Sequence, residues 1–320
     1  MKTIGVVTTG GDAPGMNAAI RAVTRIAHSK NLQVVGFERG WEGLITDKCR
    51  QLTPRGVGGI IHLGGTILYT ARCPDFKTTE GLKKAAKTLA ERCVDGLVVI
   101  GGDGSFRGAL DLTQHSSTRM VGIPATIDND VYGTDETIGF DTAVNTAVME
   151  IDKIRDTAIS HERTFIVEVM GRKRGFLALT VGITVGAEVI IIPEIKCDVS
   201  NVVTILKDNA RKGKKAGIVV TAEGCGRISE SIKEIEEQTG SEVRLTILGY
   251  VQRGGSPTAR SRLLANLFAE KAVDLLCQDQ GNCVVGLRNG KISSVGLEES
   301  CRKTKPMDTS LLKLAEMLST

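Results

Sequence analysis

Glycines and an acidic residue stand together in the turn that follows the first hydrophobic run of the chain. Residues 10–15 read GGDAPG and lead into a helical pattern at Met16–Ser29. Glycine lets backbone N–H groups approach a phosphate closely, and the start of a helix adds a partial positive charge. The spacing matches neither GxGxxG nor GxxxxGK[ST]. The turn therefore indicates phosphate binding or, alternatively, plain packing of a strand on a helix.

A second glycine turn, Gly101–Ser105 (GGDGS), follows the hydrophobic run Leu97–Ile100. Its glycines leave room for a nucleotide, and the Asp103 carboxylate could reach a Mg²⁺ ion that bridges phosphate oxygens. A surface turn is the simpler alternative.

Two carboxylates follow the run Met120–Ile123 in the segment Thr126–Asp130 (TIDND). In extended backbone, alternate side chains share one face, so Asp128 and Asp130 would lie on the same side. A neighbouring acid or Mg²⁺ would separate their pKa values, and one could then accept a hydroxyl proton. Asp, Asn and Thr are also ordinary turn residues, which leaves a structural role open.

Arginines recur beside the glycine turns. A guanidinium group matches phosphate oxygens in pairs and stays charged. One such residue could be a solvated surface charge, but five favour a substrate that carries several phosphates. They are Arg72, Arg163, Arg172, Arg244 and Arg253. With a Mg²⁺-binding acid and a second acid for a hydroxyl group, they indicate phosphoryl transfer.

Short β-branched runs alternate with helical patterns along the whole chain, which predicts an α/β fold with mostly parallel sheets. The predicted helices include 80–93, 141–159 and 200–211, and Asn289-Gly290 predicts one hairpin. The predicted strands are 4–7, 96–100, 120–123, 165–169, 189–192, 217–220 and 244–248. Because the glycine- and charge-bearing turns follow the strands, we expect a ligand site at the carboxyl ends of the sheet.

The composition excludes several classes of protein. A chain of 320 residues with 41% hydrophobic and 24% charged residues suits about two globular domains. A net charge of +4 and 3% aromatic residues argue against nucleic-acid binding. The eight cysteines contain no CxxC pair, so we expect reduced thiols and no zinc site. No signal peptide or membrane span is evident, and the protein is expected to be cytoplasmic.

Eight segments of the chain resemble the bacterial ATP-dependent 6-phosphofructokinase family, in the expected order from residue 3 to about 290. They are TTGGDAPGMNAAIR, ARCPDF, VVIGGDGS, TIDND, IRDTAISHER, VEVMGR, TAEG and LGYVQRGGSP. The resemblance implies two doubly wound α/β lobes with the active site in the cleft between them, assembled as a homotetramer. It implies an ATP- and Mg²⁺-binding lobe at 1–138 plus about 252–304, and a fructose 6-phosphate lobe at 139–251 plus about 305–320.

The resemblance also implies a reaction: phosphoryl transfer from Mg-ATP to the 1-hydroxyl of fructose 6-phosphate, the committed step of glycolysis. Asp128 matches the base, with Thr126 and Asp130 beside the transferred group, Arg172 stabilising its charge and Asp103 on Mg²⁺. The residues implied at the ATP site are Gly11, Arg72, Cys73, Gly102, Asp103, Gly104 and Ser105.

The fructose 6-phosphate site and an effector site are implied in the same way. Arg163 and Arg244 resemble residues that reach the 6-phosphate from a neighbouring subunit. The other sugar-site residues are Thr126, Ile127, Asp128, Met170, Gly171, Arg172, Glu223, Tyr250, Val251, Gln252 and Arg253. An ADP-like effector is implied between subunits, at Arg21, Arg25, Arg55, Arg155, Glu188, Lys212, Lys214 and Lys215.

Four positions depart from the family pattern. Tyr250 replaces a histidine, Ser261 an acid, Ala125 a glycine, and Pro54 an effector-site arginine. These changes affect expected affinity and regulation more than the reaction type. A pyrophosphate-dependent phosphofructokinase, an NAD or lipid kinase with GGDG, and a non-catalytic sugar-phosphate sensor remain the alternatives.

Overall fold

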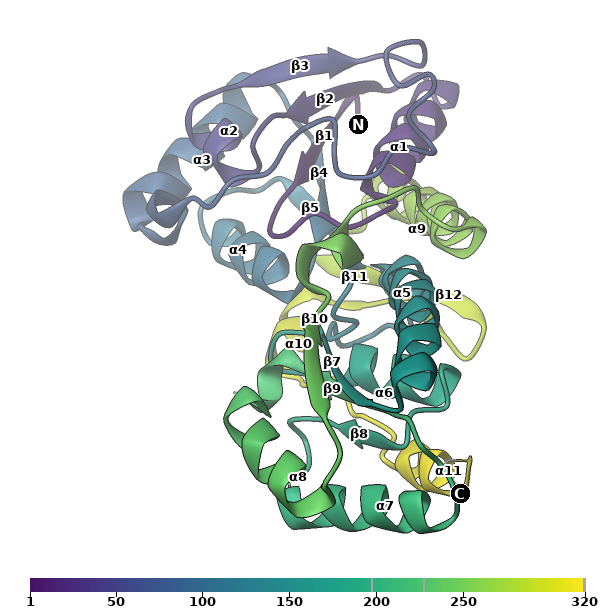
Figure 1. Cartoon of the computed structure of the whole chain (residues 1–320). Coiled ribbons are helices and arrows are strands. Elements are labelled where there is room, and N and C mark those ends of the chain that lie inside the picture. Colours follow the sequence, from purple (N-terminus) through teal and green to yellow (C-terminus); the bar gives the residue numbers. More distant parts are fainter. Residues whose placement is uncertain (197, 227, 319–320) are drawn as a thin grey trace. The chain divides into compact units, whose positions relative to one another are not determined.

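The computed structural model describes residues 1–196, 198–226 and 228–318. The chain divides into two compact units (Figure 1). The first contains Met1–Thr142 and Arg253–Lys305, and the second contains Ala143–Gln252 and the chain from Pro306 onward. Which ligand belongs to each unit stays a prediction.

The first unit is built on an eight-stranded sheet of order β12-β11-β5-β4-β1-β2-β3, with β6 paired to β5. Its strands are β1 (Thr3–Thr8), β2 (Gln33–Phe37), β3 (Cys49–Leu52), β4 (Gly96–Gly101), β5 (Arg119–Thr126), β6 (Ile138–Gly139), β11 (Cys283–Arg288) and β12 (Lys291–Gly296). Only the edge pairs β2–β3 and β11–β12 are antiparallel. The mostly parallel α/β architecture is therefore confirmed.

The central strands of this sheet are buried along their whole length, as β1 and β4 show. Continuous Val/Ile runs fit this position because helices cover both faces of a parallel sheet. The helices are α1 (Met16–Ser29), α2 (Trp41–Ile45), α3 (Thr79–Glu91), α4 (Asp103–Thr113), α9 (Ala259–Cys277) and α10 (Leu297–Arg302), with the 3₁₀ turn η1 (Pro74–Lys77). Helices α1 and α9, far apart in sequence, pack side by side (Figure 1).

Local sequence signals fix where several of these elements begin and turn. Thr78 caps α3, because its side chain accepts a hydrogen bond from the Gly81 N–H at 3.0 Å. Thr258 caps α9 through the Ser261 N–H at 3.3 Å. Asn289 and Gly290 both have positive φ, 50° and 75°, as a two-residue hairpin turn requires. The predicted hairpin is confirmed as β11–β12.

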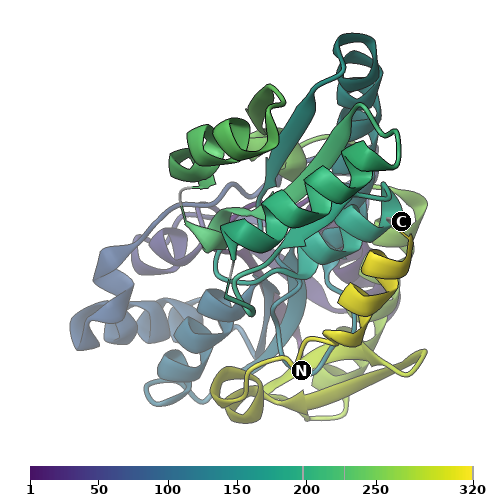
Figure 2. The same ribbon diagram turned by 60° about the horizontal axis from the view of Figure 1, so that its bottom comes forward.

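The second unit has a four-stranded, fully parallel sheet of order β10-β7-β9-β8. Its strands are β7 (Thr164–Val169), β8 (Val189–Ile191), β9 (Gly217–Ala222) and β10 (Val243–Ile247). Its helices are α5 (Phe140–His161), which begins in the first unit, α6 (Phe176–Thr184), α7 (Val199–Arg211), α8 (Ile232–Thr239) and α11 (Ser310–Leu318). The 3₁₀ turns are η2 (Glu223–Cys225), η3 (Ile228–Ser231) and η4 (Gly249–Arg253). Helix α11 packs on α6 and β8 (Figure 2).

Two further observations bear on the sequence-based expectations. Among the described residues, no helix has the length and apolar character of a membrane span. Of the described cysteines, Cys49, Cys73, Cys93, Cys277, Cys283 and Cys301 are free thiols, and Cys225 is half-buried; Cys197 lies outside the described residues.

Candidate active site

Three turns of the first unit that were predicted to be functional follow neighbouring strands, at the carboxyl end of the sheet. In the register of β1, β4 and β5, Thr8 lies opposite Ile100, and Gly101 lies opposite Pro124. The GGDAPG, GGDGS and TIDND turns follow these strand ends directly. The predicted grouping at the carboxyl ends of the strands is therefore present within this unit.

The loop after β5 lacks the extended backbone in which alternate side chains, such as Asp128 and Asp130, would share one face. Strand β5 ends at Thr126, and Asn129 has a left-handed backbone with φ of 52°. The chain turns between Asp128 and Asp130, so the condition of extended backbone is not met. Asp128 is only 6% exposed, and its N–H donates to Thr126 Oγ1 at 3.2 Å.

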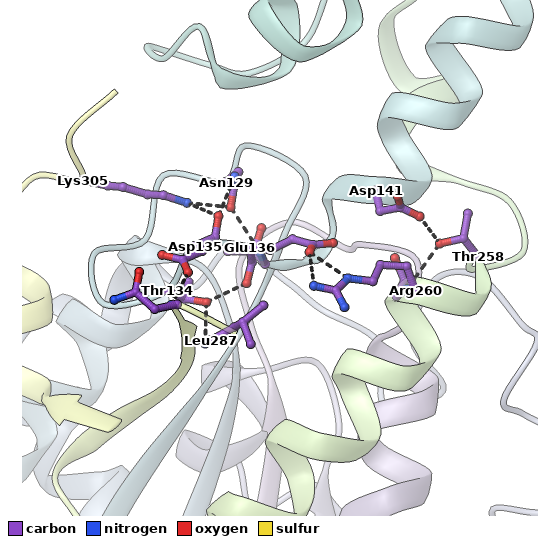
Figure 3. Close-up of polar contacts among 12 residues, drawn as sticks. Asn129, Thr134, Asp135, Glu136, Asp141, Thr258, Arg260, Leu287 and Lys305 are labelled. Carbon is purple, nitrogen blue, oxygen red and sulfur yellow. Dashed lines mark hydrogen bonds and ion pairs between the residues drawn. The ribbon is translucent and has the colours of Figure 1, made fainter. Parts of the chain in front are cut away.

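The side chain of Asn129 is anchored on several sides (Figure 3). Its Oδ1 accepts hydrogen bonds from the Thr137 N–H at 3.1 Å and from Lys305 Nζ at 2.8 Å. Its Nδ2 donates to the Asp135 carbonyl at 3.3 Å. These contacts hold the turn between the two carboxylates.

The remainder of this loop is tied to elements from distant parts of the sequence (Figure 3). The Leu287 N–H in β11 donates to Thr134 Oγ1 at 3.0 Å. Arg260, in the first turn of α9, pairs with Glu136 at 2.8 Å. One anchor lies in a strand and the other in a helix, so regular elements on two sides support the conformation of the loop.

In the GGDAPG turn, the predicted glycine roles have a geometric basis. Gly10 and Gly15 have φ of 86° and 108°, in the region that favours glycine. A Cβ at Gly11 would lie 2.9 Å from Arg253 Nη2, and this guanidinium pairs with Asp12. Arg253, expected at the sugar site, therefore belongs to the first unit and contacts the glycine turn.

The GGDGS turn begins α4, and each of its residues has a distinct environment. Asp103 accepts a hydrogen bond from Arg107 Nε at 2.9 Å, and this pairing raises the pKa of Arg107, with a smaller contribution from Asp130. A Cβ at Gly104 would meet no atom within 4 Å. The buried Ser105 hydroxyl donates to the Thr9 carbonyl at 2.9 Å and so joins this turn to β1.

Asp103 is suited to Mg²⁺ binding. Within the described residues, no group of three or more His, Cys, Asp or Glu side chains could hold a metal by itself. Mg²⁺ in kinases commonly uses one or two carboxylates, completed by substrate phosphates and water. Asp103, with open space beside it at Gly104, fits such a site.

Arg72 and Cys73 precede the 3₁₀ turn η1. Arg72 is exposed, whereas Cys73 is half-buried against the hydrophobic core. Burial raises the pKa of the Cys73 thiol, which favours the neutral form. Cys73 is therefore suited to a packing contact and has no sign of nucleophile activation.

In the second unit, the turn after β7 carries the predicted Met170, Gly171 and Arg172. Gly171 has φ of 128°, and Arg172 has φ of 54°. The Met170 N–H donates to Oε1 of the fully buried Gln252 at 2.9 Å, and the Arg172 N–H donates to Glu223 Oε1 at 2.5 Å. These two hydrogen bonds thus link four of the predicted sugar-site residues within the second unit.

The two arginines expected at the 6-phosphate share one partner. Arg163 Nε lies 2.5 Å from Glu242 Oε2, and Arg244 also pairs with Glu242. Glu242 thus holds two guanidinium groups near each other at one edge of the sheet. Tyr250 and Val251, in η4, are 76% and 56% exposed.

The predicted effector residues fall in both units. In the second unit, Glu188 accepts a hydrogen bond from the Ile218 N–H at 2.5 Å and lies 3.7 Å from Lys214 Nζ. Glu188, Lys214 and Lys215 line a cavity of about 320 Å³. Arg155 donates to the Val185 carbonyl, and Lys212 caps α7.

The remaining effector candidates, Arg21, Arg25 and Arg55, belong to the first unit. Arg25 donates to the carbonyl of Pro54 at 3.3 Å, and Arg55 is exposed. Ser261, which replaces a family acid, is buried, and its Oγ lies 2.9 Å from Thr142 Oγ1.

Four residues that contact predicted site residues were not predicted from the sequence: Asp12, Arg107, Glu242 and Lys305. Asp12 stood within a recognised motif, and the four-residue spacing of Asp103 and Arg107 could have indicated their ion pair. Lys305 had no comparable signal, because its partner Asn129 is distant in sequence. Glu242 lies two positions from Arg244, but its other partner, Arg163, is distant as well.

Comparisons with known proteins agree with this arrangement. A family model described as "Phosphofructokinase" matches residues 3–276. The chain is 51% identical over 319 residues to an "ATP-dependent 6-phosphofructokinase" of Halalkalibacterium halodurans, and 50% identical over 321 residues to "ATP-dependent 6-phosphofructokinase 1" of Thermus thermophilus. Each alignment covers 100% of both chains.

Solved structures with the same fold include phosphofructokinase from Saccharomyces cerevisiae, at 33% identity and a TM-score of 0.89. That match covers 100% of this chain and 48% of the yeast chain. A pyrophosphate-dependent phosphofructokinase from Marinobacter aquaeolei has a TM-score of 0.85 at 19% identity. That match covers 98% of this chain and 91% of the Marinobacter chain, and at this identity it shows the fold alone. The family model and the full-length relatives together show that this chain belongs to the phosphofructokinase family.

Proposed function

We propose that this protein is an ATP-dependent 6-phosphofructokinase, which converts fructose 6-phosphate to fructose 1,6-bisphosphate with Mg-ATP as donor. The observation that carries the proposal is the loop after β5, which holds a buried Asp128. This loop lies at the carboxyl end of the sheet, where both glycine turns also follow their strands. Full-length relatives at about 50% identity bear the same name.

On the donor side, the proposed contacts come from the first unit. Gly11, Gly102 and Gly104 allow close backbone approach to phosphates, with Arg72, Cys73 and Ser105 around them. Asp103 would hold Mg²⁺, which when bound neutralises charge on the phosphate oxygens. The open space at Gly104 supports a nucleotide donor, since a side chain there would occupy that space.

In the proposed chemical step, Asp128 accepts the proton of the sugar 1-hydroxyl. That oxygen bonds to the γ-phosphorus of ATP, the bond between this phosphorus and the bridging oxygen breaks, and ADP leaves. Thr126 and Asp130 flank the transferred group. Arg172 stabilises its negative charge, and the anchored 170–172 turn supports that role by limiting its freedom.

For the acceptor, we assign the 6-phosphate to Arg253, with Tyr250 close to it, and to Arg163 and Arg244 of a neighbouring subunit. Glu242 pairs with Arg163 and Arg244, so a bound phosphate would replace this carboxylate as their partner. The remaining proposed sugar contacts are Ile127, Met170, Gly171, Glu223, Val251 and Gln252.

A homotetramer with an ADP-like effector bound between subunits remains part of the proposal. The basic residues around Glu188 and the cavity of about 320 Å³ support an anion there. The loss of an arginine at Pro54 is expected to weaken effector binding, because one charge-assisted hydrogen bond is removed.

The test is an assay of donors against acceptors with the purified full chain. We expect fructose 1,6-bisphosphate from Mg-ATP and fructose 6-phosphate, little turnover with pyrophosphate, and none with NAD as acceptor. Removal of Mg²⁺ by EDTA should abolish activity, and excess Mg²⁺ should restore it. Faster turnover with pyrophosphate would refute the ATP assignment, and binding of sugar phosphate without product would identify a sensor.

A further inference from the structure

Lys305 places a buried ammonium group against the loop that carries the proposed base. Its side chain reaches this loop from the segment after α10, at the last residue of the first unit (Figure 3). Only 9% of the residue is exposed, which is rare for lysine unless the charge has partners. Nζ donates to Asn129 Oδ1 at 2.8 Å and to the Asp135 carbonyl at 2.9 Å.

These two acceptors belong to one hydrogen-bonded set. The Asp135 carbonyl also accepts from Asn129 Nδ2, so lysine, amide and carbonyl form a closed ring of three contacts. The Thr137 N–H is a further donor to Asn129 Oδ1. Losing the ammonium would remove two of these contacts and leave the amide held by the Thr137 N–H and the Asp135 carbonyl.

The strength with which Asn129 is held matters because of its backbone conformation. A non-glycine residue at φ of 52° persists only where its surroundings hold it. Its φ and ψ set the directions of Asp128 and Asp130, which lie on either side. A general base must remain within hydrogen-bond reach of its proton, and a displacement of about 1 Å can lower a rate roughly 10²-fold.

We propose that Lys305 is a positioning residue for the catalytic step, which acts through Asn129 to fix the direction of Asp128. The proposal rests on the proposed role of Asp128 as base. Lys305 itself is assigned no contact with either substrate, so its loss should change kcat and leave both KM values nearly constant.

The first test is Lys305→Met, which keeps the length of the side chain and removes the ammonium. With Mg-ATP and fructose 6-phosphate, we expect kcat to fall roughly 10²-fold and both KM values to change less than about twofold. The matched control is Lys303→Met, because Lys303 is exposed; among the described residues, it pairs with Glu299 and lies over the half-buried Tyr132 ring. The control should retain wild-type kcat.

A double-mutant cycle tests whether Lys305 acts through Asn129. Asn129→Gly keeps the left-handed backbone without strain but removes the amide. It should lower kcat, and adding Lys305→Met should lower kcat less than about twofold further, because the shared contact is already absent. Independent, multiplicative losses would overturn the proposal.

Other outcomes are equally decisive. Wild-type kcat in Lys305→Met with reduced thermal stability would show a purely structural lysine, and a raised KM alone would show a substrate contact. If Lys305→Met does not fold, Asn129→Gly alone provides the test, because it removes the amide through which Lys305 is proposed to act; unchanged kcat in that variant overturns the inference. Wild-type turnover is measured first, so failure of the proposed function is seen separately.

Discussion

At the scale of one residue, the left-handed backbone of Asn129 turns the chain between the two acidic residues Asp128 and Asp130. The sequence Thr-Ile-Asp-Asn-Asp indicated an acid for the hydroxyl group but not the shape of the segment. Asparagine tolerates the left-handed region better than most residues, yet many asparagines lie elsewhere. The decisive contacts come from Thr137 and Lys305, and their proximity depends on the folded chain.

For Asp128 itself, we expect Asp128→Asn to lower kcat by roughly 10²-fold or more, because an amide cannot accept the proton. Both KM values should change little, since this interaction is made mainly in the transition state. Steady-state kinetics with Asp111→Asn, an exposed position on α4, provide the control. An increase in KM alone would mean that Asp128 positions substrate and is not the base.

At the scale of elements, the hydrophobic runs predicted seven parallel strands, β1, β4, β5 and β7–β10, but not the parallel strand β2. The predicted run 4–7 lies inside β1, and the predicted helix Met16–Ser29 matches α1. Strand β3 was missed, because its sequence Cys-Arg-Gln-Leu is mostly exposed on the sheet edge. Helix α9 was missed since its apolar residues lie on more than one face, as expected for a helix packed on several elements.

The β4–α4 connection yields a test of the space at Gly104. Gly104→Ala should raise the free energy of unfolding by about 0.5 kcal/mol, because the residue is helical and a Cβ meets no atom. Gly104→Asp should instead raise KM for ATP roughly 10-fold or more, since the larger side chain enters the proposed nucleotide space. Urea denaturation and initial-rate kinetics measure the two effects. An unchanged KM for ATP in Gly104→Asp would place the nucleotide elsewhere.

At the scale of the whole molecule, the parallel sheets and the family could be predicted from the sequence, whereas the pairing of charges could not. Arg163 and Arg244 were recognised as phosphate-binding candidates, but their common partner Glu242 was not. The pair between Arg163 and Glu242 depends on strand register. Parallel β7 and β10 bring together residues that lie about 80 positions apart.

The stability of the chain should carry a pH signature from Glu168. Burial first, and then the nearby Glu223 carboxylate, raise the pKa of Glu168 in the folded state. A raised carboxyl pKa means that folding favours the protonated form. Stability should therefore fall as pH rises from the unfolded pKa of about 4.3 through the raised folded pKa.

Glu168→Gln removes this dependence because the amide does not ionise. The variant should be more stable than wild type at pH 8, and this advantage should disappear near pH 4. Urea denaturation at both values measures it, with Glu237→Gln on the exposed face of α8 as the control. An advantage that is the same at both pH values would refute the assignment to Glu168.

The return of the chain to the first unit at Arg253 has a consequence for biosynthesis. During translation, residues 143–252 emerge before β11, β12 and Lys305 exist, although these late segments complete the unit that began with Met1. Domains generally fold as units in the order of synthesis, but here the N-terminal unit is continuous in space and interrupted in sequence. Its first 142 residues must wait with the part of β5 at Val121 and Gly122 lacking its β11 partner, and the Asn129 turn gains its lysine only after Lys305 has been synthesised.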